Sequence, residues 1–143
     1  MEILIASDHA GYDLKEFVKQ FFKERFSWID FGTFSTESVD YPDFIHPLAK
    51  EIEDNPDKKG IIICGSGNGV SMVANKHKNV RAALCWENEI ALLARQHNDA
   101  NILALPARFI SKEQACEMIN TFFTVAFENG RHKQRVDKIN YDV

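Results

Sequence analysis

Short apolar runs rich in β-branched residues alternate along the chain with segments of helical periodicity, and this alternation limits the fold more than any other feature of the sequence. Alternating strands and helices form βαβ units, which build a parallel sheet covered by helices on both faces, with right-handed crossovers. The sequence therefore predicts an α/β fold, a three-layer αβα sandwich around a doubly wound, five-stranded parallel sheet of Rossmann-like type. The expected strands are Ile3 to Ala6, Trp28 to Phe31, Ile61 to Cys64, Val80 to Cys85 and Ile102 to Leu105.

The helices between these strands follow from the spacing of apolar residues. Residues 14 to 22 keep their apolar side chains on one face, which predicts an amphipathic helix. Another helix is predicted to open at Ser111, with Gln114 completing a capping box, and to continue as far as Ala126. Pro47 suggests that a helix has only just begun there, because a missing N–H costs least in the first turn. The remaining helices are expected over 44 to 54, 69 to 77 and 87 to 97.

The length and composition indicate one globular domain spanning residues 1 to 143. A chain of 143 residues can bury one sizeable core, and the sequence contains no repeat, no Gly/Ser-rich linker and no break in composition. Residues 129 to 143 form a polar, basic C-terminal segment, which we expect to be a tail or a helix. Three cysteines without a Cys-x-x-Cys pair indicate free thiols and argue against a disulfide framework or a metal site.

The charge balance excludes several classes of partner. A formal charge of −4 lacks the basic footprint that nucleic acids and anionic membranes require. No apolar run reaches the roughly 20 residues of a membrane-spanning helix. The first residues, Met1 to Ile5, lack the features of a secretory signal. We therefore expect a cytoplasmic protein that binds neither nucleic acid nor a membrane.

The clearest chemical motif follows the third predicted strand. Gly65, Gly67 and Gly69 alternate at the start of a helix, a pattern that favours a cradle of backbone N–H groups for an anion. A tight turn that needs positive φ is the alternative explanation. Cys64 directly precedes this loop, whose partial positive charge would lower a thiol pKa and favour a base or nucleophile. A cysteine at the end of an apolar strand is, however, more often a small buried hydrophobe. Ser66 either assists proton transfer or is an ordinary turn residue.

Other polar residues follow neighbouring strands. Asp8 and His9 end the first strand, which lies next to the third in doubly wound sheets, so both are candidates for the crevice that contains Cys64. Such an acid and imidazole suit sugar chemistry, although Asp8 is equally suited to capping a helix and His9 to lying exposed. Tyr41, within the Asp40-Tyr41-Pro42-Asp43 loop, either closes the pocket or belongs to a simple turn.

A phosphate clamp is a further possibility. Guanidinium groups match phosphate oxygens bidentately, so the arginines would bind phosphate if they converge with His9. The spacing of Arg131 and Arg135 puts both on one helix face, but it also fits a solvated basic tail. The candidate residues are His9, Arg108, Arg131 and Arg135.

His97 does not fit a site built from one chain. It precedes the fifth predicted strand and so lies at the amino end of the sheet, roughly 17 Å from the end where Cys64 is expected. His97 is therefore either an exposed helix C-cap, favoured by the helix dipole, or a contribution to the crevice of a neighbouring subunit. A two-fold shared active site would account for His97 and for the basic C-terminal segment together.

Taken in order, these motifs closely resemble the type B ribose-5-phosphate isomerase family over nearly the whole chain. The resemblance implies interconversion of D-ribose 5-phosphate and D-ribulose 5-phosphate through an enediolate, without metal or cofactor, in a homodimer or tetramer whose active sites are shared between subunits. The residues that carry the resemblance are Ser7 to Gly11, Asp40 to Pro42, Cys64 to Gly69, Ala74 to Lys76, Arg81 to Ala83, His97 to Asn101, Gly130 to His132 and Arg135 to Val136.

The resemblance also implies roles for individual residues. Cys64 corresponds to the base that moves a proton between C2 and C1, and Ser66 to the group that assists transfer between the oxygens. His97 and Asp8 correspond to the groups that open the sugar ring. The remaining roles are stabilisation of the enediolate by the loop Gly65, Gly67, Asn68 and Gly69, contacts to the sugar by Tyr41 and Asn98, and binding of phosphate by His9, Arg108, Arg131 and Arg135.

Two departures and three rival functions accompany this resemblance. Ser66 stands where many members have threonine, which keeps the hydroxyl, and Pro106 replaces a frequent glycine beside Arg108. The nearest rival is an isomerase of a six-carbon sugar phosphate, such as allose 6-phosphate or galactose 6-phosphate. A non-catalytic phosphate-binding module is a second rival. A thiol redox protein is a third, although no second cysteine is placed to resolve a sulfenic acid.

Overall fold

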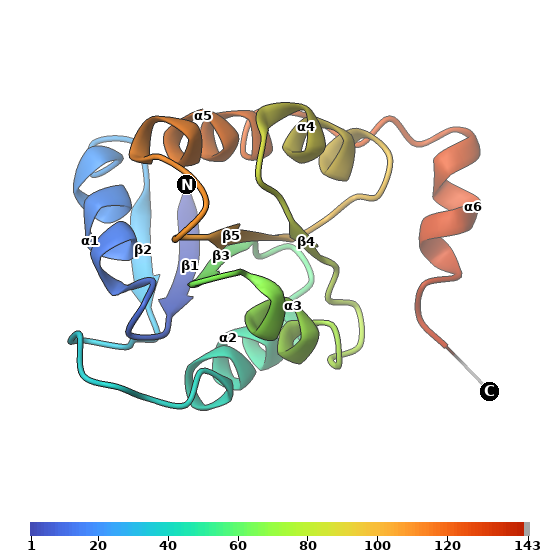
Figure 1. The fold of residues 1–143 in the computed structure, drawn as a ribbon. Coiled ribbons are helices and arrows are strands. Elements are labelled where there is room, and N and C mark those ends of the chain that lie inside the picture. Colours follow the sequence, from blue (N-terminus) through green and yellow to red (C-terminus); the bar gives the residue numbers. More distant parts are fainter. Residues whose placement is uncertain (142–143) are drawn as a thin grey trace.

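The computed structural model describes residues 1–141, and within them the chain forms a five-stranded sheet in the order β2-β1-β3-β5-β4. Every strand pairs in parallel with its neighbours, which confirms the predicted fold. Helices lie above and below the sheet in Figure 1. The strands are β1 (Glu2–Ser7), β2 (Ser27–Asp30), β3 (Gly60–Cys64), β4 (Ala82–Leu84) and β5 (Ile102–Pro106).

The core consists of two apolar layers, one on each face of the sheet. Ile61 and Ile63 of β3 pack toward α1, α4 and α5, whereas Ile62 packs toward α2 and α3. All residues of β3 and β5 are buried, as expected for central strands that are covered on both faces. The helices are α1 (Tyr12–Phe21), α2 (Pro42–Asp54), α3 (Asn68–Ala74), α4 (Asn88–Gln96), α5 (Lys112–Phe122) and α6 (Arg131–Asp137).

Helix α2 begins earlier than the sequence suggested. It starts at Pro42, whose missing N–H costs nothing in the first turn, and Pro47 lies inside the helix. The expectation that the helix begins near Pro47 is therefore wrong. The apolar residues Ile45, Leu48, Ala49 and Ile52 are buried against the sheet, and their burial outweighs the hydrogen bond lost at Pro47.

Helix α5 and strand β4 are shorter than expected. The capping box of Ser111 and Gln114 is present, but α5 ends at Phe122 rather than at Ala126. Beyond Phe122, the carbonyl of Val125 accepts a hydrogen bond from Arg95, which holds this segment beside α4. At the edge of the sheet, β4 covers only 82–84, and the side chain of Asn75 pairs with both the N–H and the carbonyl of Ala82.

The basic C-terminal segment forms a helix that stands apart from the sheet. Helix α6 is at the right of Figure 1, and none of its residues, Arg131–Asp137, is buried. Two hydrogen bonds between Asn140 and Asn79 attach the following residues to the loop before β4. Positions 142 and 143 of the predicted segment lie outside the described residues. None of the helices in the described part of the chain is long and apolar enough to cross a membrane.

Candidate active site

A pocket of about 500 Å³ lies where the chain leaves β1, β3 and β5. These strands are neighbours in the sheet, so the turns after their carboxyl ends meet at one edge. Eight of the residues predicted from the sequence share this pocket, from three different turns and from the start of α2. The lining residues are Asp8, His9, Ala10, Tyr41, Cys64, Gly65, Ser66, Gly69, Arg108 and Phe109.

The sulfur of Cys64 borders the loop of alternating glycines. The backbone N–H of Gly67 donates a hydrogen bond of 3.1 Å to its Sγ, and the side chain of Cys64 is almost completely buried. The hydroxyl of Ser66 accepts a hydrogen bond of 3.2 Å from the N–H of Asn68. Asn68 also lines an adjoining hollow with Ser66 and Trp86. The loop thus brings a thiol and backbone donors together at the pocket.

Glycine is needed at each of the three positions of the loop for a different structural reason. Gly67 has φ +76°, so it occupies the left-handed conformation that the turn explanation requires. Gly65 has negative φ, but a Cβ there would lie 3.1 Å from the guanidinium of Arg108. A Cβ on Gly69 would lie 2.5–2.7 Å from ring carbons of Tyr41 and 2.8 Å from its hydroxyl. Glycine at 65 and 69 therefore allows Arg108 and Tyr41 to close in on the loop.

Asp8 and His9 are both held in place by backbone groups. A carboxylate oxygen of Asp8 accepts a hydrogen bond of 3.0 Å from the N–H of Gly11, which orders the turn before α1. The Nδ1 atom of His9 accepts a hydrogen bond of 3.2 Å from the N–H of Val39, in the loop before α2. A neutral His9 must then carry its proton on Nε2, which makes this nitrogen a donor.

Four of the predicted site residues lie elsewhere in the chain. Among residues 1–141, neither His97 and Asn98 nor the two arginines of α6 line the pocket that contains Cys64. His97 follows the last turn of α4, and Asn98 lines a separate hollow with Arg81. Arg131 and Arg135 are one turn apart on α6, as their spacing predicted. One chain therefore separates the predicted site into two groups.

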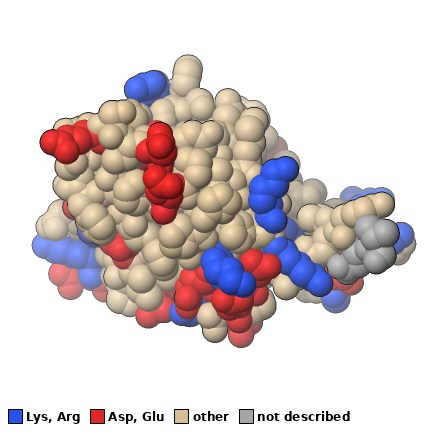
Figure 2. All heavy atoms as spheres, turned by 90° about the horizontal axis from the view of Figure 1, so that it is seen from below, with Lys and Arg blue, Asp and Glu red and all other residues tan. Residues whose placement is uncertain are grey.

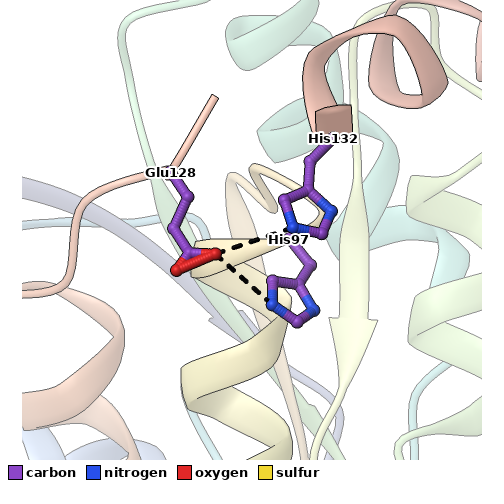
Figure 3. A group of neighbouring side chains, drawn as sticks. All are labelled: His97, Glu128 and His132. Atoms are coloured by element: carbon purple, nitrogen blue, oxygen red, sulfur yellow. Dashed lines mark ion pairs between the residues drawn. The ribbon is translucent and has the colours of Figure 1, made fainter. Parts of the chain in front are cut away.

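His97 belongs to a cluster that sequence reasoning missed. Figure 3 shows the carboxylate of Glu128 facing both His97 and His132, with Nε2 to Oε1 distances of 3.5 Å and 3.6 Å. The two imidazole rings are stacked, with centroids 4.1 Å apart and an angle of 13° between their planes. The only signal in the sequence was the four-residue spacing of Glu128 and His132, at the boundary of the segment 129 to 143 that was interpreted as a basic tail.

Two imidazoles and a carboxylate are a donor set that divalent transition metals accept. The arrangement of the rings fits an ion poorly, because a nitrogen lone pair lies in the plane of its ring. A point within about 2.1 Å of both nitrogens would lie outside both of the nearly parallel ring planes. The rings of His97 and His132 would have to turn before they could share a metal.

The three free cysteines differ in the surroundings of their thiols. Burial raises the pKa of the Cys85 thiol to about 12, so it stays protonated at neutral pH. Partial burial and the nearby Glu113 also raise the pKa of Cys116. In the other cluster, desolvation and the neighbouring His97 lower the pKa of His132. Of the three cysteines, Cys64 is the one that lines the pocket.

Comparison with known proteins places these features in a family. A family model described as "Ribose/Galactose Isomerase" matches residues 3–139. The "Probable ribose-5-phosphate isomerase B" of Mycoplasma pneumoniae is 45% identical over 139 residues, covering 96% of this chain and 91% of that protein. A crystal structure of a ribose 5-phosphate isomerase from Thermotoga maritima matches with a TM-score of 0.93 and 46% identity, covering 96% of each chain.

A further structure carries a ligand. Ribose-5-phosphate isomerase B from Mycoplasma genitalium with bound ribulose-5-phosphate matches with a TM-score of 0.92 and 43% identity. The match covers 96% of this chain and 93% of that one. The likeness thus includes the fold, the sequence and nearly the full length of both proteins.

Proposed function

The chain belongs to the ribose/galactose isomerase family, and on that premise we propose that it interconverts D-ribose 5-phosphate and D-ribulose 5-phosphate. Relatives at 43–46% identity carry this activity in their names, and one of them was solved with the ketose phosphate bound. The observation that carries the proposal is the position of Cys64, whose sulfur accepts a hydrogen bond from the glycine loop and borders a pocket large enough for a pentose phosphate.

Cys64 is the base in the mechanism we propose. An aldose becomes a ketose when a proton leaves C2 and returns at C1, so the base needs to reach both carbons, and the oxygens that gain negative charge need donors. The thiolate of Cys64 takes the proton from C2 and delivers it to C1. The N–H groups of the loop from Gly65 to Gly69 stabilise the enediolate, and the hydroxyl of Ser66 assists proton transfer between O1 and O2.

Residues from both groups contact each remaining part of the substrate in this mechanism. His9 offers Nε2–H and Arg108 offers its guanidinium to phosphate oxygens, and Arg131 and Arg135 complete the clamp. Tyr41 and Asn98 contact the sugar hydroxyls, while His97 and Asp8 act on the closed ring. Because the phosphate is remote from the reacting carbons, its binding energy serves to orient them.

We further propose that two copies of the chain share each active site. The separation of the Cys64 pocket from His97 and α6 within one chain supports this arrangement. An exposed apolar side chain, Met72 on α3 with 67% of its surface accessible, also supports association on that side. The view of the α2 and α3 side in Figure 2 shows an area without charged side chains between a strip of acidic side chains and the basic side chains at the right. We place the enzyme in the cytoplasm, where its three free thiols would remain reduced.

A panel of sugar phosphates tests the proposed activity and its substrate together. Purified protein is incubated with ribose 5-phosphate, allose 6-phosphate and galactose 6-phosphate, and the ketose product is followed by NMR. We expect the highest kcat/KM with ribose 5-phosphate. A higher kcat/KM with a hexose phosphate would assign the chain to the six-carbon branch, and inactivity toward all three sugars would overturn the proposed function.

A further inference from the structure

The backbone places Glu128 beside His97. The N–H of Glu128 donates a hydrogen bond of 3.0 Å to the carbonyl of Gln96, the residue just before His97. The carbonyl of Val125, three residues before Glu128, accepts a hydrogen bond from the guanidinium of Arg95. Arg95 is itself almost fully buried and also bonds to Ala100 on the far side of His97. The segment that carries Glu128 is thus attached to the end of α4 at two points.

The carboxylate of Glu128 connects this fixed segment to α6. Its Oε1 atom lies 3.5 Å from Nε2 of His97 and 3.6 Å from Nε2 of His132, in the first turn of α6. None of the residues of α6 is buried, and these polar contacts, the stacking of His132 on His97 and the Asn79–Asn140 pair connect the helix to the rest of the chain. The same carboxylate therefore contacts the ring-opening histidine and the helix that carries both phosphate-binding arginines.

We propose that Glu128 is a positioning residue for ring opening, which holds the imidazole of His97 in a fixed orientation relative to the arginines of α6. This inference rests on the proposed isomerase function. It assigns to Glu128 the part that an orienting carboxylate plays beside a catalytic histidine, in which it fixes the ring and stabilises the imidazolium that forms when the ring accepts a proton. With Nε2 of His97 facing Glu128, Nδ1 is the nitrogen left to exchange a proton with the sugar.

The chemistry of the two sugars shows where this orientation matters. Ribose 5-phosphate is a closed furanose that opens when the bond between C1 and the ring oxygen breaks. One proton leaves the O1 hydroxyl, one proton arrives at the ring oxygen, and the C1 carbonyl forms, so no other reactant is consumed. Ribulose 5-phosphate cannot close such a ring, because its C5 oxygen carries the phosphate. Ring opening is therefore required of the aldose alone.

The test compares Glu128→Gln with the wild-type enzyme on both sugars. Glutamine keeps the size of the side chain but removes the charge that stabilises the imidazolium. With ribose 5-phosphate, the initial rate of the variant should stop rising in proportion to enzyme concentration and approach the rate of spontaneous ring opening in solution. Its turnover number from the aldose at high enzyme concentration should be about tenfold or more below that of the wild type. With ribulose 5-phosphate, the rate should stay proportional to enzyme concentration.

A matched control is available in a second histidine pair. Glu53 contacts Nδ1 of His77 at 3.2 Å, and Nε2 of His77 lies 2.8 Å from Nδ1 of His46, on the α2 and α3 side of the sheet. Glu53→Gln therefore removes a carboxylate from a comparable imidazole pair outside the proposed site. This variant should behave like the wild type with both sugars.

The outcomes separate a positioning role from a structural one. If Glu128→Gln loses activity by the same factor in both directions, and its rates remain proportional to enzyme concentration, Glu128 supports only the fold and the inference is wrong. Wild-type behaviour of both Glu128→Gln and Glu128→Ala would equally overturn it. Thermal unfolding of each variant identifies any loss that comes from misfolding. Inactivity of the wild type toward both sugars would instead remove the proposed function, and the inference with it.

Discussion

At the scale of single residues, the surroundings of the three cysteines give them different chemistry. Cys85 lies in the apolar layer with α4 and α5, where burial raises its pKa to about 12. Cys64 is also buried, at the end of β3, yet its sulfur lies beside the N–H of Gly67 and lines the pocket. The difference comes from the loop that follows Cys64, because this loop directs backbone N–H groups toward the pocket.

Replacing Cys64 by alanine tests the base. We expect kcat to fall by at least about 1,000-fold, because the step that moves hydrogen between the carbons has no other base, whereas binding of inorganic phosphate should change little. Steady-state kinetics and calorimetric titration with phosphate measure the two effects. Cys116→Ala is the control, since this thiol lies outside the pocket, and it should keep full activity. Equal activity of the two variants would exclude Cys64 as the base.

Site residues could be predicted from the sequence where they lie close together along the chain. The loop from Gly65 to Gly69 could be recognised because its glycines follow a buried strand directly. Glu128 could not, because it is brought to His97 by a main-chain hydrogen bond to Gln96, which lies far from it along the chain. A contact of this type depends on where α5 ends, and apolar periodicity placed that end four residues too late.

At the scale of elements, a buried ion-pair network joins α1 to the end of β2. The ammonium group of Lys15, whose side chain is fully buried, lies 2.5 Å from the carboxylate of Asp30, and Lys19 lies 2.8 Å from the same oxygen. Asp30 also accepts a hydrogen bond from the N–H of Gly32, where the loop that carries Val39 begins. The network thus anchors the loop whose backbone fixes His9.

This network makes stability depend on pH. Burial opposes ionisation of Asp30, but hydrogen bonds from Lys15 and Lys19 outweigh it and lower the pKa below the ordinary value of 3.8. A lowered folded-state pKa gives stability that is fully present above the unfolded-state value and is lost as pH falls through the folded-state value. The free energy of unfolding should therefore decrease as the pH falls from about 5 toward the lowered pKa of Asp30.

Asp30→Asn tests this dependence by urea denaturation at several pH values. At pH 7 the variant should be less stable by up to about 3 kcal/mol, because Lys15 then keeps only the more exposed Glu16 as a counter-charge. Its stability should also vary less with pH below 5. Asp54→Asn, which removes the exposed partner of Lys50, should leave both the stability and its pH dependence nearly unchanged. If the free energy of unfolding of Asp30→Asn still decreased steeply below pH 5, the pH dependence would come from other carboxylates.

Whether a segment forms a helix or a strand could be predicted, because burial on one or both faces sets the spacing of its apolar residues. The residues at which each helix or strand ends were harder to predict. Pro47 was misleading because its effect on the helix is local, whereas the four apolar residues that hold α2 against the sheet act together. The outer edge of β4 is covered by Asn75, a side chain seven residues away that pairs with Ala82 as a neighbouring strand would. Side-chain pairing of this kind leaves no periodic trace in a sequence.

At the scale of the whole molecule, the topology explains why the proposed site needs two chains. All strands of the sheet are parallel, so the turns after β1, β3 and β5 gather at one edge and the segment that precedes β5 starts from the other. His97 precedes β5, and α6 extends beyond β4 in Figure 1. No change of side-chain rotamer brings these groups to Cys64, because the length of the strands separates them. In the arrangement that we propose, a two-fold axis supplies them from a partner.

Mixing two inactive variants tests the shared site. Cys64→Ala and His97→Ala chains each leave every site of their own homodimer incomplete. In a hybrid dimer, one site combines the intact Cys64 of one chain with the intact His97 of the other, and the second site lacks both. Random exchange of equal amounts should therefore restore about a quarter of wild-type activity, since half of the dimers are hybrids and each has one working site. Native mass spectrometry measures the exchange.

A chain that carries both substitutions gives the opposite expectation. When it is mixed with wild-type chains, each site of the hybrid lacks either Cys64 or His97, so hybrid dimers should be inactive and total activity should fall as exchange proceeds. If each site were instead built from one chain, these hybrids would keep one working site, and the two single variants would never complement one another. The pair of mixtures therefore distinguishes the two arrangements by results of opposite sign, whatever the absolute rate of the enzyme.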